Sequence, residues 1–263
     1  EEEEDISTSG CGRNIILYGV PGCGKSHEIK TNYCKDPAFM ERVVFHPDYM
    51  YSEFVGQILP RVEKDESGND KLKYVFTPGP FTKMLKKAES DPENYYYLVI
   101  EELNRGNAPA IFGEIFQLLD RKDEDEFPAD EVGESEYGIS NYDVAKEVYE
   151  DEAHPVRIPS NMYILATMNT ADQNVFTLDT AFQRRWNMRQ IENRFDKSEH
   201  SKDIIAGTKV NWGAFATVIN DMVIDINVDM ASSEDKRLGT YFAKKKELES
   251  NRFPEKVLKY LWD

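Results

Sequence analysis

Short apolar runs alternate with helical patterns over the first two thirds of the chain. Buried strands are predicted where a run is apolar almost throughout: Asn14–Tyr18, Arg42–Phe45, Tyr96–Ile100, Tyr163–Met168 and, last, Trp186–Gln190. Helices are predicted between them, at Lys25–Tyr33, Pro80–Ala88, Pro109–Leu119 and Leu178–Arg185. Strands that alternate with helices are typical of a parallel sheet covered on both faces. The pattern therefore predicts an α/β fold with five parallel strands between helices.

Two stretches within this region break the alternation. Arg61–Glu63 and Lys71–Phe76 flank a polar turn, and this arrangement predicts a β-hairpin. The segment Lys122–His154 is acidic and rich in Gly, Ser and Tyr, which predicts mostly loop or hairpin.

The last part of the chain has a different character. Beyond Phe195 no strand pattern remains, and Val210–Asp225 and Pro254–Trp262 have helical spacing. We therefore expect three parts, listed by residue number: an acidic linker or excision boundary at 1–12, an αβα core at 13–194 and a small helical subdomain at 195–263.

Composition narrows the functional classes. The net charge is −17, from 32 Lys and Arg against 49 Asp and Glu, which argues against a surface that grips nucleic acid as a whole. The three cysteines form no C-x-x-C pair, which favours a reducing compartment. No apolar run approaches the roughly 18 residues of a membrane-spanning helix, and the acidic start is unlike a signal peptide. We expect a cytoplasmic protein without a membrane partner.

A phosphate-binding motif follows the first predicted strand. Gly19–Ser26 reads GVPGCGKS and matches the pattern G-x-x-x-x-G-K-[ST] without departure. Glycines let backbone N–H groups line a nest for phosphate oxygens, and the following helix points its positive end at the same anion. Lys25 is expected to reach the β- and γ-phosphates, and the Ser26 hydroxyl to bind Mg²⁺. The predicted nucleotide-binding residues are Gly19, Pro21, Gly22, Cys23, Gly24, Lys25, Ser26 and His27.

Two carboxylates end a later apolar strand. Tyr96–Ile100 runs directly into Glu101 and Glu102. In enzymes with this phosphate loop, the first acid holds Mg²⁺ and the second polarises the attacking water. The usual first acid is Asp, and this chain has Glu101 instead. The alternative is a pair of solvated acids at a strand end. We predict Glu101 with Ser26 as metal ligands and Glu102 as the catalytic base.

Several ordered segments resemble the motor subunits of modification-dependent restriction systems, the McrB-type AAA+ proteins. The resemblance covers residues 13 to 190 and continues more weakly to the end of the chain. Its motifs, in chain order, are FHPDY at Phe45–Tyr49, YSEFVG at Tyr51–Gly56, LVIEELNRGN at Leu98–Asn107, IFGE at Ile111–Glu114, LLDR at Leu118–Arg121, ATMNTAD at Ala166–Asp172, LDTAFQRRW at Leu178–Trp186 and KRLGTYF at Lys236–Phe242.

The resemblance implies roles for residues outside the phosphate loop. Asn169 corresponds to a sensor that orients water near the γ-phosphate, and Asp172 belongs to the same signature. Arg184 and Arg185 correspond to a segment carrying an arginine finger that acts in the neighbouring subunit's site; Arg185 is the first choice and Arg184 the second. The alternatives are a turn-capping Asn and a pair of solvated arginines. Gln173 replaces the family's usual Arg.

The resemblance also implies a function and partners. It predicts an AAA+ nucleoside triphosphatase that assembles into a ring, a hexamer, and powers DNA restriction. The helical subdomain would be its lid, from which Arg237 could approach the nucleotide. Partners would be an McrC-like nuclease subunit and DNA, read by a domain outside this chain.

Other functions remain open at this stage. A MoxR- or dynein-related ATPase that remodels proteins would share the fold and the site. A scaffold that switches with nucleotide without turnover is the second alternative, kept open by Glu101 and Gln173. The base is open as well, because the resemblance implies GTP, the wider AAA+ class uses ATP, and phosphate loops read phosphates only.

Overall fold

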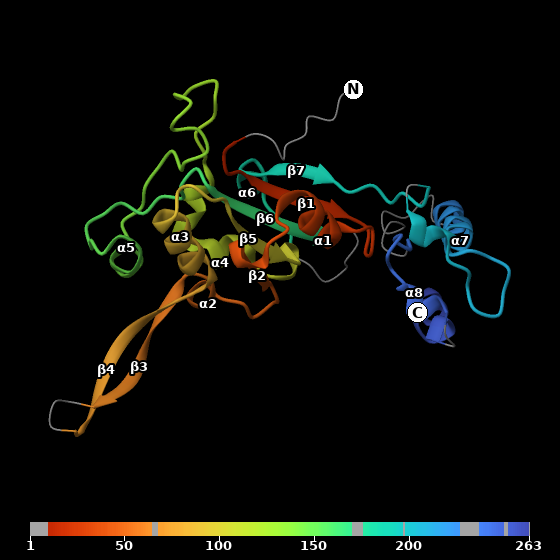
Figure 1. Cartoon of the computed structure of the whole chain (residues 1–263), viewed down its shortest axis with the longest axis horizontal. Helices are drawn as coiled ribbons and strands as arrows, with labels where there is room; N and C mark the ends of the chain where they lie inside the picture. The colour runs from red at the N-terminus through yellow and green to blue at the C-terminus, as the bar shows by residue number, and fades with distance from the viewer. Residues whose placement is uncertain are drawn as a thin grey trace. The chain divides into compact units, whose positions relative to one another are not determined.

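A computed structural model of the chain describes residues 10–64, 68–169, 176–196, 198–226, 237–249 and 252–262. Its central feature is a five-stranded sheet in the order β2-β5-β6-β1-β7 (Figure 1). The strands are β1 (Asn14–Gly19), β2 (Met40–Val44), β5 (Tyr96–Glu101), β6 (Met162–Asn169) and β7 (Asn187–Gln190). Each of the five predicted strands is present, to within a few residues at its ends.

The sheet is parallel where its register is defined. Met40 lies opposite Tyr97 in the β2–β5 pair, and Tyr96 lies opposite Met162 in the β5–β6 pair. Strands β1, β5 and β6 are almost wholly buried, as expected when both faces of a parallel sheet are covered. This confirms the predicted α/β class and its parallel five-stranded sheet.

Helices and one hairpin complete the described chain. The hairpin consists of β3 (Gly56–Lys64) and β4 (Asp70–Pro78), and is longer at both ends than the sequence pattern predicted. The helices are α1 (Lys25–Glu28), α2 (Tyr51–Phe54), α3 (Pro80–Ser90), α4 (Ala108–Phe112), α5 (Tyr142–Tyr149), α6 (Thr180–Gln183), α7 (Trp212–Ile226), α8 (Lys245–Leu248) and α9 (Lys259–Trp262). Among the described residues, no helix is long and apolar enough to cross a membrane.

One helix prediction was wrong, and one loop segment contains a helix. The acidic stretch predicted as mostly loop or hairpin is largely irregular but contains α5, whose first turn is capped by the Asn141 side chain accepting from Val144 N–H, and which buries Val144 and Ala145. The predicted helix Pro109–Leu119 is not continuous. It changes from α4 to a 3₁₀ segment at Gly113, whose φ of 52° lies in the left-handed region.

The described residues form two compact units that interleave along the chain. The first comprises residues 10–16, 32–166 and 176–188, and the second 17–31, 167–169 and the residues from 189 onward, within the described ranges. The division predicted from sequence, at 1–12, 13–194 and 195–263, stays a prediction.

The first unit has an aromatic core. Phe54 packs edge-on against Phe45, with 5.5 Å between ring centroids, and lies 5.0 Å from the ring of Phe112. Phe112 in turn contacts Phe182 and Trp186. These rings join α2, α4 and α6, and their burial contributes about 2 to 3 kcal/mol each. Away from this core, the β3–β4 hairpin extends beyond α2 and α3 (Figure 1).

The second unit has its own core around Trp212, which is fully buried in α7. The Trp212 indole N–H donates to Thr240 O at 2.7 Å, so the buried ring leaves no polar atom unpaired. Ala216, Leu238, Leu248 and other apolar side chains pack around it. The helical character predicted for this part of the chain is confirmed at Trp212–Ile226 and Pro254–Trp262.

A partly buried arginine joins separate segments of the first unit. Arg121 donates to Asn14 Oδ1 at 3.1 Å, Gly133 O at 2.7 Å and Met162 O at 2.9 Å, and more weakly to Ile158 O and Pro159 O. Burial lowers the pKa of its guanidinium to about 9, which still leaves it charged at neutral pH. The five acceptors offset the cost of burying the charge.

Replacing this arginine tests its structural role. We expect Arg121→Met to lower the free energy of unfolding by about 2 to 4 kcal/mol, because four backbone carbonyls and one amide oxygen lose their donor. Urea denaturation followed by circular dichroism measures the change. The matched control is Arg61→Met on the exposed hairpin, expected within about 0.5 kcal/mol of the unchanged chain. Equal effects of the two substitutions would contradict the assigned role.

Candidate nucleotide site

The phosphate loop has the backbone that its motif requires. Strand β1 ends at Gly19 and α1 begins at Lys25, so Gly19–Ser26 is a strand–loop–helix connection. Gly22 and Gly24 have φ angles of 78° and 112°, in the region that side chains with a Cβ avoid. The residues between strand and helix therefore adopt a turn that depends on glycine at these two positions.

Lys25 is anchored inside this loop. Its side chain is buried, and Nζ donates to Gly19 O at 2.9 Å and Val20 O at 3.1 Å. The Cys23 sulfur lies 3.9 Å from the same nitrogen. Burial raises the pKa of the Cys23 thiol, although the Lys25 charge opposes this, so Cys23 remains a neutral thiol at neutral pH. Lys25 is thus held by the carbonyls of the loop that would surround the phosphates.

A segment from late in the chain lies directly on the loop. Tyr241 N–H donates to Gly22 O at 2.7 Å, and the Tyr241 ring lies 5.7 Å from the ring of His27. A cavity of about 140 Å³ beside the loop is lined by Gly19, Val20, residues 190–193 and Arg237. The structure thus places Arg237 and His27 close to the phosphate loop, and their roles toward the nucleotide stay predictions.

The two acids at the end of β5, Glu101 and Glu102, have different surroundings. The Glu101 carboxylate forms an ion pair with Arg42, and its carbonyl accepts from Phe45 N–H at 2.9 Å. Glu102 has a φ of 56°, in the left-handed region, and its carboxylate lies 3.3 Å from Arg105 Nε. A non-glycine residue held in this region costs of order 1 kcal/mol or more, and such strain concentrates at functional sites. The backbone therefore turns sharply at the predicted base.

The predicted sensor lies at the end of a strand. Asn169 is the last residue of β6 and is buried. Asp172 and Gln173 lie outside the described residues, so their predicted roles stay predictions.

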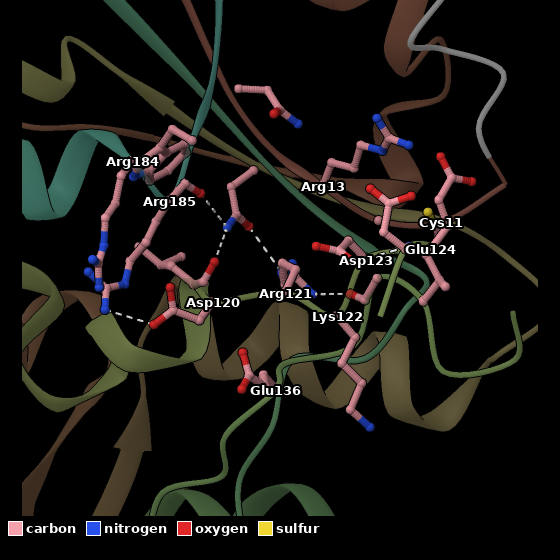
Figure 2. Close-up of a pocket in the computed structure, with 18 residues that line it drawn as sticks. Cys11, Arg13, Asp120, Arg121, Lys122, Asp123, Glu124, Glu136, Arg184 and Arg185 are labelled. Carbon is pink, nitrogen blue, oxygen red and sulfur yellow. Dashed lines mark hydrogen bonds and ion pairs between the residues drawn. The ribbon is translucent and has the colours of Figure 1, made fainter. Parts of the chain in front are cut away.

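The two arginines after α6, labelled in Figure 2, differ in exposure. Arg184 is exposed, whereas the Arg185 side chain is only 9% exposed. Arg185 Nη2 lies 2.7 Å from Asp120 Oδ2, and Nη1 donates to Ala181 O at 2.7 Å. Its guanidinium carbon lies 4.1 Å from the centre of the Phe116 ring. Both arginines line a cavity of about 420 Å³, which Asp120 and Arg121 also line.

A metal ion is implied by the chemistry of the loop. The described residues contain no cluster of three or more His, Cys, Asp or Glu side chains that could hold one by themselves. Mg²⁺ is usually bound through substrate phosphates, water and one or two protein oxygens, so a hydroxyl and a carboxylate are a suitable donor set. Ser26 and Glu101 supply these two donor types and stay the proposed ligands.

Sequence reasoning did not single out Asp120 or Asn14. Asn14 is buried at the start of β1, and its amide nitrogen donates to Leu119 O at 2.8 Å and Arg185 O at 3.0 Å. Its position at the head of a buried strand was the one signal in the sequence, because a polar side chain there needs partners. Asp120 lies in the LLDR motif of the resemblance, to which sequence reasoning assigned no role.

Comparisons with known proteins agree with this geometry. Residues 14–186 match the family model for the AAA domain, dynein-related subfamily. The chain is 36% identical to a Bacillus subtilis (strain 168) protein named as type II restriction enzyme BsuMI component YdiS, over 95% of this chain and 78% of that protein. It is 30% identical to the type IV methyl-directed restriction enzyme EcoKMcrB subunit of Escherichia coli (strain K12), over 70% of this chain and 36% of that protein. A crystal structure from Cytophaga hutchinsonii (15% identical, 92% of this chain, 53% of that chain, TM-score 0.34) is too distant to add to the argument.

The family model spans the strand before the phosphate loop, the loop itself, the acids after β5 and the arginine pair. The chain therefore belongs to the dynein-related AAA family and is a McrB-like AAA+ nucleoside triphosphatase with a phosphate loop.

Proposed function

We propose that the chain is the motor domain of a DNA restriction system, which hydrolyses GTP, or alternatively ATP, with Mg²⁺ and assembles into a hexameric ring. The observation that carries this proposal is the phosphate loop, with its two left-handed glycines and anchored Lys25, in a chain related over 95% of its length to a restriction component. The residues from 195 onward would form a lid, and the cytoplasm is the expected compartment.

Each predicted site residue has its own role in hydrolysis. Lys25 and the loop N–H groups bind the phosphates, and Glu102 accepts a proton from the attacking water. Asn169 orients that water, and Asp172 positions neighbouring groups. Mg²⁺, held by Ser26 and Glu101, neutralises phosphate charge when it is bound. Arg185 and Arg184 complete the site of a neighbouring chain and stabilise charge on its γ-phosphate.

The relatives support the choice of partners. Both curated relatives are named as parts of restriction enzymes, and this chain spans 36% of the Escherichia coli protein. A net charge of −17 is unsuited to a motor that grips DNA over its whole surface. DNA recognition by a domain outside this chain and cleavage by an McrC-like nuclease subunit are therefore part of the proposal. The dynein-related family model keeps a protein-remodelling ATPase as the second candidate.

The contact between the loop and the segment around Tyr241 leads to a first test. A Cβ built on Gly239 would lie 2.2 Å from Gly22 C and 2.3 Å from Pro21 O, so the backbone of the loop must move to admit it. We expect Gly239→Ala to weaken nucleotide binding at least about tenfold, a cost of about 1.4 kcal/mol.

The binding is measured by titration with a fluorescent nucleotide. The matched control is Gly10→Ala, whose Cβ would lie 3.5 Å from Tyr95 Oη, an ordinary van der Waals contact, and should leave the affinity unchanged. Lys25→Ala removes the charge that meets the phosphates, and its affinity serves as the reference for complete loss of binding. Full affinity in Gly239→Ala would show that the loop tolerates movement of this contact.

Glu102 gives the test of turnover. Replacing it with Gln keeps the size of the side chain and removes the base, so nucleotide should still bind while hydrolysis falls about 100-fold or more. Phosphate release measured at saturating nucleotide reports the effect, and Glu93→Gln, a change at an exposed acid, is the control. Normal turnover in Glu102→Gln would refute the assignment of the base. Absence of turnover in the unchanged chain, with and without a nuclease subunit, would favour a scaffold.

The preference for guanine or adenine in the nucleotide is tested by direct competition. We expect GTP to displace a fluorescent nucleotide at lower concentration than ATP, by about tenfold, because specific hydrogen bonds to a base edge discriminate at least this strongly. Hydrolysis of the tighter ligand should then be measured. Tighter binding of ATP would overturn the choice of GTP and leave the rest of the proposal in place.

A further inference from the structure

The Arg185 guanidinium contacts three other groups of its own chain. Asp120 binds one nitrogen of the guanidinium, Ala181 O accepts from another, and the Phe116 ring packs against its face. Figure 2 shows Arg185 and Asp120 side by side at the edge of the cavity, with Arg184 next to them. The position of the guanidinium is therefore defined by three separate groups.

The backbone of Arg185 is fixed as well. Asn14 Nδ2 donates to Arg185 O at 3.0 Å, and Asn14 Oδ1 accepts from Arg121. The next residue, Trp186, is buried against Phe182 and Phe112. The main chain at the arginine pair is thus tied to strand β1 and to the aromatic core.

Restraint of the side chain in advance lowers the entropy that is lost when the group binds a phosphate on another chain. A free arginine side chain has many rotamers, and ordering it costs about 1.5 to 2 kcal/mol. A guanidinium already held in place does not lose this entropy when a phosphate arrives. Ala181 O accepts from Nη1 and Asp120 from Nη2, and each of these nitrogens carries a second N–H, so donor capacity remains for an anion.

We propose that Asp120 is a positioning residue for the trans-acting arginine pair: it holds the Arg185 guanidinium in the place from which it meets the γ-phosphate bound to a neighbouring chain. The inference rests on the proposed hydrolysis in a ring. Asp120 touches neither nucleotide nor water in this scheme, and acts only through Arg185. The charge of its carboxylate lowers the cost of keeping the Arg185 side chain, which is only 9% exposed, buried until then.

Mixed assemblies of two full-length variants separate this role from a structural one. The acceptor chain carries Arg184→Ala and Arg185→Ala, so its own nucleotide site is complete but it offers no arginine. The donor chain carries Lys25→Ala, so it binds no nucleotide but offers the arginine pair. Neither chain alone should hydrolyse the nucleotide, and mixing them should restore turnover in the acceptor's sites.

Asp120→Asn is then placed in one chain at a time. In the donor we expect it to lower the restored kcat about tenfold and to change KM less than about twofold, because the arginine acts in the transition state. In the acceptor, which lacks Arg185, the same substitution should leave the restored rate as it was. Asp120→Glu in the donor should recover most of the rate. Glu124→Gln in the donor, at another acid of the same cavity, is the matched control.

The outcomes are distinguishable. Absence of restored turnover with the unmodified donor overturns the proposed trans action, and the inference with it. Restored turnover that Asp120→Asn does not lower in the donor, or lowers equally in both chains, overturns the positioning role alone. A higher rate with Asp120→Asn in the donor would show that the carboxylate restrains Arg185, which also contradicts the proposal. Thermal unfolding of each variant checks that the chains remain folded.

Discussion

The partly buried hydrogen bond between Arg121 and Asn14 joins segments that are more than a hundred residues apart in sequence. Asn14 begins the strand that leads into the phosphate loop, and Arg121 gathers carbonyls from Gly133 to Met162. Because buried polar groups are costly unless they are paired, these side chains leave the surrounding backbone few alternative arrangements. The same asparagine binds the carbonyl of Arg185, so the first strand and the arginine pair share one amide.

The two parts of the candidate site depend on different kinds of interaction. The loop that binds phosphates depends on local backbone angles, above all at Gly22 and Gly24. The arginine pair depends on long-range contacts, through Asn14, Asp120 and the ring of Phe116. The first part serves the nucleotide of the chain itself, and the second, in the proposed ring, serves that of a neighbour.

The sequence predicted what is locally encoded. Five apolar runs became five strands, and the motif at Gly19–Ser26 formed the expected connection between β1 and α1. It failed where tertiary contacts decide. Helix α5 lies in an acidic segment whose few apolar residues gave no clear period, and Gly113 interrupts a helix that spacing alone made continuous. The pairing of Asp120 with Arg185 was beyond sequence reasoning, because 65 positions separate the two residues.

In the proposed ring, hydrolysis depends on assembly. The most direct test is the rate of phosphate release per chain, measured at saturating nucleotide across a range of chain concentrations. Sedimentation of the same samples gives the fraction of assembled chain. If neighbouring chains complete each site, the rate per chain rises with concentration in step with that fraction. A rate per chain that stays constant while the assembled fraction changes would contradict the claim, since each chain would then hydrolyse its nucleotide alone.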